Sequence, residues 1–291
     1  MTSPAVPVMS PSAQPAAPAR SFWQRQRWLI LRRFSQGLIL LAFMTGPWFG
    51  LWIAKGNLSS SLFFDVLPLT DPLLVLQTLA TGHLPYRTAL IGAAIVLGLY
   101  LLLGGRIFCS WVCPVNMVTD AAAWTRRRLG IKTGRVPDAN TRYWLLVGIM
   151  IATAVTGTLV WEWVNPVSLL HRGLIFGMAS AIWVVAGVFI YDLLVAGRGW
   201  CGHLCPLGAF YSLLGNTALL RVSAANRSAC NDCMDCFTVC PEPQVIRPAL
   251  KLAGQQSPLI LSANCTACGR CIDVCDLNVF KMTHRFDQRS A

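Results

Sequence analysis

The chain has few charged side chains and lacks several common cofactor-binding motifs. Charged residues make up 12% of its 291 residues, about half of the share in soluble globular domains. No C-x-x-C-H motif is present, which excludes covalent attachment of c-type haem. No G-x-G-x-x-G motif follows a predicted strand, which argues against a nicotinamide or flavin domain. None of the 12 cysteines lies outside four regularly spaced motifs, so their role is redox chemistry rather than packing alone.

Hydrophobic residues are abundant instead. They make up 55% of the chain, and its mean hydropathy is +0.53. These values are typical of a membrane protein that carries a soluble appendage. The formal net charge is +12, but the basic residues cluster beside apolar stretches, where they orient helices in a membrane. We therefore expect contact with membrane lipid and no binding of nucleic acid.

Uncharged apolar stretches cover residues 34–54, 88–105, 143–161 and 173–191. At about 1.5 Å per residue, each is long enough to be a transmembrane helix. Basic residues concentrate before the first stretch and between the second and third, so the positive-inside rule predicts cytoplasmic N- and C-termini. A signal peptide is the alternative for the first stretch, but it is long for one and lacks a small-residue cleavage site. The sequence therefore predicts a multi-pass protein of the bacterial inner (cytoplasmic) membrane.

An internal repeat divides the membrane part into two similar halves. G-R-I-F-C-S-W-V-C-P at 105–114 matches G-R-G-W-C-G-H-L-C-P at 197–206. Upstream, D-P-L-L-V-L at 71–76 resembles N-P-V-S-L-L at 165–170. Repeats at a fixed offset indicate duplication of a structural unit. We expect each half to be a transmembrane hairpin that ends in a C-x3-C-P motif on the inner face.

Two cysteine runs dominate the C-terminal segment, and both read C-x2-C-x2-C-x3-C. This is the bacterial ferredoxin pattern for a pair of [4Fe–4S] clusters, in which the fourth cysteine of each run binds the other cluster. The rule predicts a first cluster on Cys230, Cys233, Cys236 and Cys275. It predicts a second cluster on Cys265, Cys268, Cys271 and Cys240.

Two other uses of these eight cysteines are disulfides and zinc sites. Zinc ribbons use two separated cysteine pairs for each ion, whereas here three cysteines lie within seven residues. Disulfides need an oxidising compartment, and the charge pattern predicts that this segment is cytoplasmic. The iron–sulfur interpretation is therefore favoured. Asp276 stands where proline usually follows such a run, and we expect its carboxylate to lower the potential of the nearby cluster slightly.

The fold expected from these patterns is an α-helical membrane protein with four transmembrane helices in a duplicated hairpin. A C-terminal α+β ferredoxin domain with two clusters follows. The predicted divisions are a disordered and basic cytoplasmic N-terminus at 1–33, a transmembrane domain with two C-x3-C-P motifs at 34–220, and the ferredoxin-type domain at 221–291.

The remaining cysteines form the pairs Cys109–Cys113 and Cys201–Cys205. Their i, i+4 spacing places both thiols of a pair on one face of a helix, and the following proline fits a first helical turn. Packing alone is one interpretation, although duplication of the whole motif argues against it. The others are redox-active thiols linked to quinol, or metal ligands that converge on one site. Spacing alone does not decide between them.

Together, the apolar stretches, the two C-x3-C-P motifs and the paired cluster runs resemble the NapH-type membrane ferredoxins of periplasmic nitrate reductase systems. The stretch F-C-S-W-V-C-P-V-N-M-V-T-D carries the resemblance particularly clearly, and the similarity covers about residues 25–285. It implies an electron-transfer subunit of a quinol dehydrogenase, with membrane quinol as donor. It also implies a periplasmic ferredoxin-type partner that passes electrons toward nitrate reductase.

Two alternative functions stay open at this point. Related membrane ferredoxins donate electrons during assembly or maturation of a metalloenzyme, although no periplasmic segment rich in Met or His is found here. In the second alternative, the chain is a membrane anchor for a ferredoxin module. One difficulty is common to the electron-transfer hypotheses, since the predicted clusters lie inside while the implied acceptor lies outside, across about 30 Å of hydrocarbon.

Overall fold

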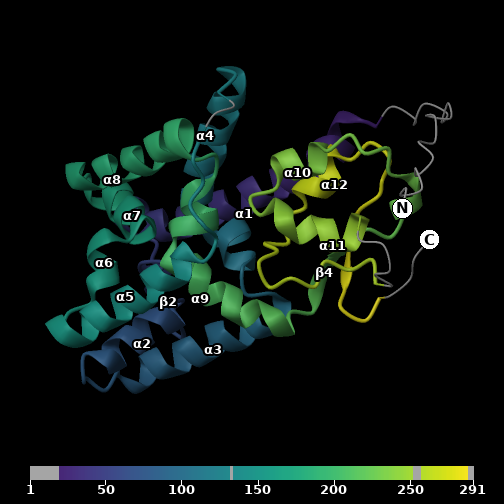
Figure 1. Cartoon of the computed structure of the whole chain (residues 1–291). Helices are drawn as coiled ribbons and strands as arrows, with labels where there is room; N and C mark the ends of the chain where they lie inside the picture. The colour runs from purple at the N-terminus through teal and green to yellow at the C-terminus, as the bar shows by residue number, and fades with distance from the viewer. Residues whose placement is uncertain (1–19, 132–133, 252–256, 288–291) are drawn as a thin grey trace, which may run out of the picture.

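The structure is a computed structural model that describes residues 20–131, 134–251 and 257–287. Of the N-terminus predicted to be disordered at 1–33, residues 1–19 lie outside the described residues, whereas residues 22–33 belong to a helix, so the prediction of disorder was wrong there. A helical domain occupies one end of the molecule and a smaller mixed domain occupies the other (Figure 1). The helical domain contains α1 (Phe22–Phe49), α2 (Pro72–Ala80), α3 (Arg87–Leu103), α4 (Val115–Arg128), α5 (Thr141–Thr156), α6 (Val160–Val164), α7 (Pro166–Phe176), α8 (Ala179–Ile190) and α9 (Pro206–Leu214).

Helix α1 is the one helix, among the described residues, that is both long and apolar enough to cross a membrane. It begins at a capping box formed by Ser21 and Gln24 and ends at Gly50, whose φ of 73° is in the left-handed region. The other apolar helices are shorter and cover Arg87–Leu103, Thr141–Thr156 and Ala181–Val195. At 1.5 Å per residue they are about 23–26 Å long.

The last predicted apolar stretch, 173–191, is not one helix. Helix α7 ends at Phe176 because Gly177 takes a left-handed conformation with φ 66°, and α8 starts two residues later at Ala179. Beyond Ile190 the chain continues as a π-helical turn, η2 (Tyr191–Val195). The prediction of a continuous helix was wrong because hydropathy does not detect a glycine cap inside an apolar run.

The connections that were expected to be simple outer loops contain structure. Strands β1 (Ala54–Gly56), β2 (Ser60–Phe63) and β3 (Leu67–Thr70) form an antiparallel sheet in that order. The short helices α2 and α7 follow their Asx-Pro pairs. Asp71 caps α2 by accepting from the Leu73 amide at 3.0 Å, and Asn165 caps α7 by accepting from the Val167 amide at 3.1 Å. The resemblance between 71–76 and 165–170 therefore corresponds to a shared structural unit.

The two C-x3-C-P motifs also share a backbone conformation. The first begins in the π-helical turn η1 (Phe108–Val112) and the second in η3 (Trp200–Leu204). In each turn the second cysteine donates its amide to the carbonyl five residues earlier, Cys113 to Phe108 and Cys205 to Trp200, both at 2.9 Å. The chain then becomes extended and starts a new helix, α4 or α9. The expected junction with a helix start is present, and the repeat is a structural duplication.

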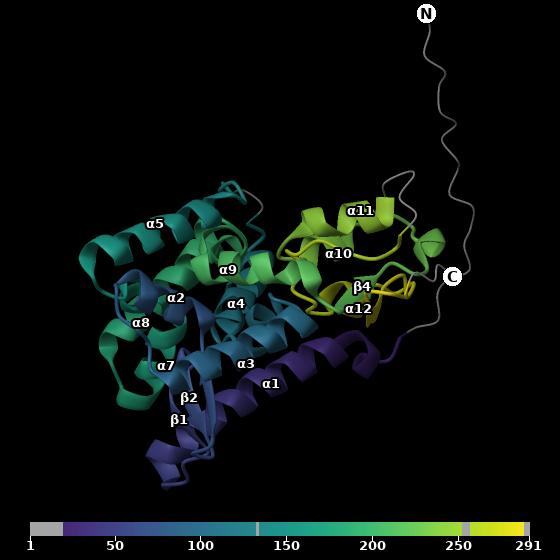
Figure 2. The ribbon, with the colours of Figure 1, turned by 90° about the horizontal axis from the view of Figure 1, so that it is seen from below.

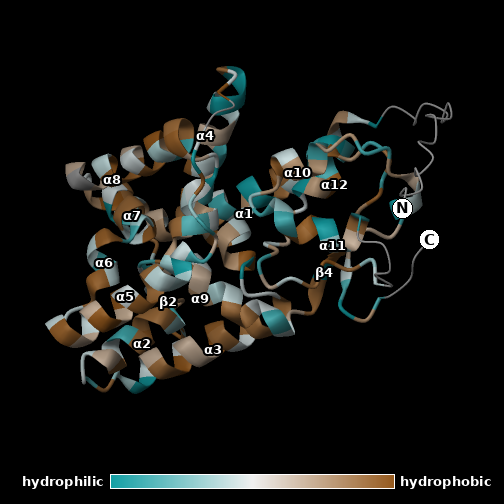
Figure 3. Ribbon diagram, in the orientation of Figure 1, coloured by the Kyte–Doolittle hydropathy of each residue, from teal (hydrophilic) through white to brown (hydrophobic). Residues whose placement is uncertain are grey.

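The smaller domain contains β4 (Leu220–Ser223), α10 (Asp235–Val239), α11 (Ile246–Lys251), α12 (Arg270–Val274) and β5 (Lys281–His284). Strands β4 and β5 pair antiparallel with Leu220 opposite His284. The core includes Val222, Ile246, Ile260 and Ile272. Figure 2 shows the N-terminal part of α1 running beneath this domain. Hydrophobic residues concentrate on the helices at the other end (Figure 3).

Candidate iron–sulfur centres and the paired-cysteine cavity

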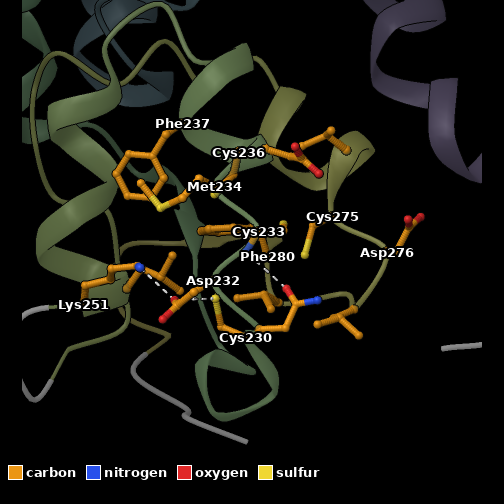
Figure 4. Close-up of a pocket in the computed structure, with 16 residues that line it drawn as sticks. Cys230, Asp232, Cys233, Met234, Cys236, Phe237, Lys251, Cys275, Asp276 and Phe280 are labelled. Atoms are coloured by element: carbon orange, nitrogen blue, oxygen red, sulfur yellow. Dashed lines mark hydrogen bonds and ion pairs between the residues drawn. The ribbon is translucent and has the colours of Figure 1, made fainter. Parts of the chain in front are cut away.

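The first cluster site is a cavity of about 270 Å³ lined by Cys230, Cys233, Cys236 and Cys275. Figure 4 shows these thiols with Asp232, Met234 and Phe280 around them. Cys240, the fourth cysteine of the first run, does not line this cavity. The thiols that line this cavity therefore come from both runs.

The second cluster site is a narrower cavity lined by Cys240, Cys265, Cys268 and Cys271. The loops of the two sites have the same conformation, because left-handed residues occur at Asp232 and Met234 in one run and at the matching Ala267 and Gly269 in the other. Three thiols from one loop and a fourth from the other run are the donor set of a [4Fe–4S] cluster. The residues present therefore fit two such clusters.

The two sites differ in exposure and in electrostatics. At the first site Cys233 is exposed, and Asp232 and Asp276 have side chains 68% and 57% accessible to solvent. At the second site Cys268 is buried. Burial raises the pKa of the Cys268 thiol, but the guanidinium groups of Arg270 and Arg32 outweigh it and hold the pKa at about 7. The second site is therefore enclosed in positive potential, whereas the first opens toward solvent among carboxylates.

Both C-x3-C-P turns contact the loops of the second cluster site. In η1, Ser110 donates its hydroxyl to the Thr266 carbonyl at 2.7 Å, and Trp111 donates its indole N–H to the Ala267 carbonyl at 3.2 Å. In η3, Gly202 occupies the position equivalent to Ser110 and lies against Pro241; a Cβ there would be 3.3 Å from the Pro241 carbonyl oxygen. The two C-x3-C-P turns thus meet the ferredoxin domain at the second site, whereas the start of α1 reaches the first site, where Arg25 pairs with Asp276 at 3.2 Å.

A buried carboxylate strengthens this junction. Glu242, two residues after Cys240, is 1% exposed, and its Oε1 lies 2.6 Å from Arg106 Nη1 and also accepts from Arg142. Arg106 further donates to the carbonyls of Asn264 at 3.1 Å and Cys201 at 2.9 Å. Buried ions must be paired in this way because an unpaired charge costs several kcal/mol, about 3–5.

A second charge cluster surrounds Asp120 on α4. Its carboxylate lies 2.8 Å from Arg270 and 3.3 Å from Arg198, and Arg33 and Arg32 also pair with it. Burial raises the pKa of Asp120, but Arg270 and Arg198 outweigh it and hold the pKa well below its usual range. These arginines come from α1, from the second C-x3-C-P repeat and from the ferredoxin domain. Asp120 therefore links three separate parts of the chain.

The four remaining cysteines converge. Cys109, Cys113, Cys201 and Cys205 line one narrow cavity together with Pro166. All twelve cysteines of the chain are free thiols. Among the residues that the structure describes, no three His, Cys, Asp or Glu side chains are close enough to hold a single metal ion. The four thiols therefore line one cavity, but no three of them are positioned to bind one metal ion.

The roles of the charged residues that hold the domains together are not apparent from the sequence alone. Arg106 and Arg198 were visible as the repeated arginine upstream of each cysteine pair, and Arg270 stands inside the second run. The sequence did not indicate that Asp120 and Glu242 are buried and paired, because an isolated acidic residue is usually exposed to solvent.

Comparisons with known proteins agree with this arrangement. A family model described as a 4Fe-4S binding domain matches residues 88–132 and again 176–222, and a 4Fe-4S dicluster domain matches residues 229–279. No solved structure matches.

Similar curated proteins span nearly the whole chain. The ferredoxin-type protein NapH of Escherichia coli is 52% identical over 92% of this chain and 93% of its own. The methylamine utilization ferredoxin-type protein MauN of Methylorubrum extorquens is 52% identical over 92% of each chain, and MauN of Paracoccus denitrificans is 51% identical over 93% of this chain and 95% of its own. With two cluster sites and two repeats of this kind, the chain belongs to the family of iron–sulfur electron-transfer proteins that includes NapH and MauN.

Proposed function

We propose that this protein is the membrane-bound iron–sulfur subunit of a quinol dehydrogenase. It takes electrons from membrane quinol and passes them through a periplasmic ferredoxin-type partner toward nitrate reductase. The observation that carries the proposal is the buried contact between the duplicated helical domain and the second cluster site, through Ser110, Trp111 and Arg106. Quinol is apolar and is met in the bilayer, so its oxidation needs electron carriers that are joined to membrane helices.

The topology belongs to the same proposal. The apolar helices α1, α3, α5 and α8 cross the inner membrane, with both termini in the cytoplasm. Helices α2 and α7 fill the outer part of the domain and compensate for the short lengths of α3, α5 and α8. The basic residues in the first part of α1 and before α5 support this orientation.

The site residues act as two electron carriers and a paired-cysteine centre. When bound, each cluster accepts and releases one electron at a time. The first is held by Cys230, Cys233, Cys236 and Cys275, and the second by Cys265, Cys268, Cys271 and Cys240. The separate lining of the two cavities supports this crossed assignment. Cys109, Cys113, Cys201 and Cys205 lie between the second site and the membrane helices, where redox-active thiols would extend the chain of carriers.

The test is anaerobic purification of the protein, iron and sulfide analysis, and EPR spectroscopy during titration with quinol. We expect about eight iron and eight sulfide per chain and reduction of the clusters by quinol. Clusters that stay oxidised at every quinol concentration would overturn the proposal and favour the assembly factor or the membrane anchor.

Replacement of Cys240 by Ala tests the crossed assignment in the same preparation. The variant should lose the EPR signal of the cluster on the second run and keep that of the first. Loss of the first-run signal alone would contradict the assignment.

A methylamine utilization system is a second candidate for the system in which this protein transfers electrons. MauN proteins are as similar to this chain as NapH proteins are, at 48–52% identity against 50–52%. The electron-transfer chemistry is the same in both, and growth of a deletion strain on methylamine or on nitrate distinguishes them.

A further inference from the structure

A groove of about 800 Å³ separates the helical domain from the ferredoxin domain on the side of α1 and α4. One wall is a face of α1 that includes Leu29 and Arg32. A second wall is the face of α4 that carries Met117, Ala121 and Trp124. The floor is formed by α10 and α12. The α1 residues that line the groove lie between Arg25 and Arg33, directly before the uncharged apolar part of α1 that begins at Phe34.

The floor of the groove adjoins ligands of both clusters. Asp235 and Val239 line it from α10 and directly precede Cys236 and Cys240. Arg270 and Val274 line it from α12 and directly precede Cys271 and Cys275. A molecule in the groove is therefore one residue away from ligands of the first and second cluster sites.

The walls combine apolar surface with excess positive charge. Trp124 is 55% exposed, and Met117 and Leu29 extend the apolar part. The arginines of the lining outnumber its aspartates. Arg270 pairs with Asp120 through its Nη2, and its buried Nη1 lacks a hydrogen-bond partner, so this ion pair does not use all the donors of Arg270. Such a wall stabilises an aromatic or apolar molecule that bears negative charge on oxygen.

We propose that this groove is the site where membrane quinol is oxidised, an inference that rests on the proposed function and deepens it. The quinol ring packs against Met117 and Trp124, and the arginines stabilise the quinolate and semiquinone anions. Both quinol O–H bonds break. The ring loses two electrons and becomes a quinone, and the two protons leave for water at the end of the groove beside the carboxylates of Asp235 and Asp276. A [4Fe–4S] cluster held at each of the two sites would accept one of the electrons.

The position of the groove favours quinol over an anionic phospholipid. The head group of an anionic lipid would pair with the arginines equally well, but its binding does not require a floor that adjoins ligands of both clusters. Quinol needs that floor, because each of its electrons must reach a separate one-electron acceptor. The two occupants make different predictions for a groove that has been filled by mutation.

The experiment uses the full chain with its clusters in lipid nanodiscs. The probe is 2-heptyl-4-hydroxyquinoline N-oxide, a quinol-site ligand whose fluorescence is quenched on binding. Replacement of Ala121 by Trp fills the groove from α4. Replacement of Ala94 by Trp adds the same side chain on the exposed face of α3 and is the matched control. Arg127→Gln, at the open end of α4, removes a charge without adding bulk.

We expect A121W to raise the dissociation constant of the probe at least tenfold and to slow quinol-driven cluster reduction at least tenfold. Iron content should stay unchanged, and A94W should match the wild type. R127Q should raise the dissociation constant of the probe by a smaller factor. This second variant keeps the inference testable should A121W fail to fold.

Three outcomes overturn the inference in different ways. Wild-type probe binding and wild-type cluster reduction in both A121W and R127Q would place quinol oxidation elsewhere while leaving the proposed function intact. Loss of co-purified phosphatidylglycerol from A121W, without a change in probe binding, would make the groove a lipid site. A wild-type protein that binds no probe and whose clusters no quinol reduces would remove the proposed function itself.

Discussion

Arg270 is the residue that connects the second cluster site to the helical domain. Its Nη2 lies 2.8 Å from Asp120, and its charge acts on the Cys268 thiol two positions earlier. A cationic group beside a cluster ligand stabilises the reduced, more negative cluster and raises its potential.

We therefore expect Arg270→Gln to lower the potential of the second cluster by tens of millivolts, where about 60 mV is a tenfold change for a one-electron couple. EPR-monitored redox titration measures this. The potential of the first cluster should change less. Arg247→Gln, an exposed position on α11, serves as the control and should leave both potentials at wild-type values. Equal shifts of both clusters in R270Q would indicate a general disturbance of the domain instead.

Asp120 predicts a dependence of stability on pH. Because its pKa in the folded protein lies below the ordinary value of about 4, the carboxylate contributes stability above pH 4 and loses it as the pH falls further. At neutral pH Asp120→Asn leaves buried arginines unpaired and should cost about 3–5 kcal/mol.

The difference in unfolding free energy between wild type and D120N should be largest above about pH 4 and should shrink as the pH falls from about 4 to about 2. Thermal unfolding at matched pH values measures it. Cluster loss at low pH affects both proteins, so the difference between them is the informative quantity. A difference that is constant across this range would show that the charge of Asp120 does not matter for stability.

At the scale of elements, the two π-helical turns raise the question of what their cysteines do. Serine is nearly isosteric with cysteine but is a far poorer metal ligand and forms no disulfide. If Cys109, Cys113, Cys201 and Cys205 carry redox chemistry, single Ser variants should lose quinol-dependent electron delivery to the partner while both clusters persist. The duplicated bond from Cys113 to Phe108 and from Cys205 to Trp200 implies similar defects in the two halves.

The measurement is electron delivery in membranes that contain each variant at matched protein levels. If the cysteines only pack, each substitution should cost about 1–3 kcal/mol for a buried hydroxyl and leave electron delivery intact. Wild-type delivery in all four variants would support the packing interpretation.

Sequence spacing predicted the elements around the cysteines well and the membrane elements less well. Three cysteines in seven residues constrain a loop strongly, and the ferredoxin rule adds a fourth cysteine from the other run, a set that matches the lining of the two cavities. Hydropathy carries no such constraint. It did not find the end of α7 at Gly177, and it treated α2 as loop although Asp71 and Pro72 are a helix-start signal. The contacts of Asp120 and Glu242 are tertiary and leave no local pattern.

At the scale of the whole molecule, the orientation in the membrane is the prediction with the widest consequences. Reporter fusions after Ala291 should score as cytoplasmic, because the basic first part of α1 and the basic segment before α5 stay inside. Fusions near Ser60 and near His83, in the connection between α1 and α3, should score as periplasmic. A periplasmic C-terminus would reverse the orientation and place the clusters on the same side as the implied acceptor.

The bonds of Arg106 bear on how the protein is assembled in the cell. They reach Glu242, just after one run of cluster cysteines, and Asn264, just before the other. These two segments are far apart in the chain and are drawn together by the ligands of the second cluster. We therefore expect the helices to enter the membrane first. The ferredoxin domain docks on them only after iron is available and the second cluster has formed. In iron-starved cells, inserted chains should have a C-terminal domain that proteases cleave readily; equal resistance with and without iron would contradict this order. Docking would then act as quality control, since a chain without its second cluster would remain recognisable and be degraded.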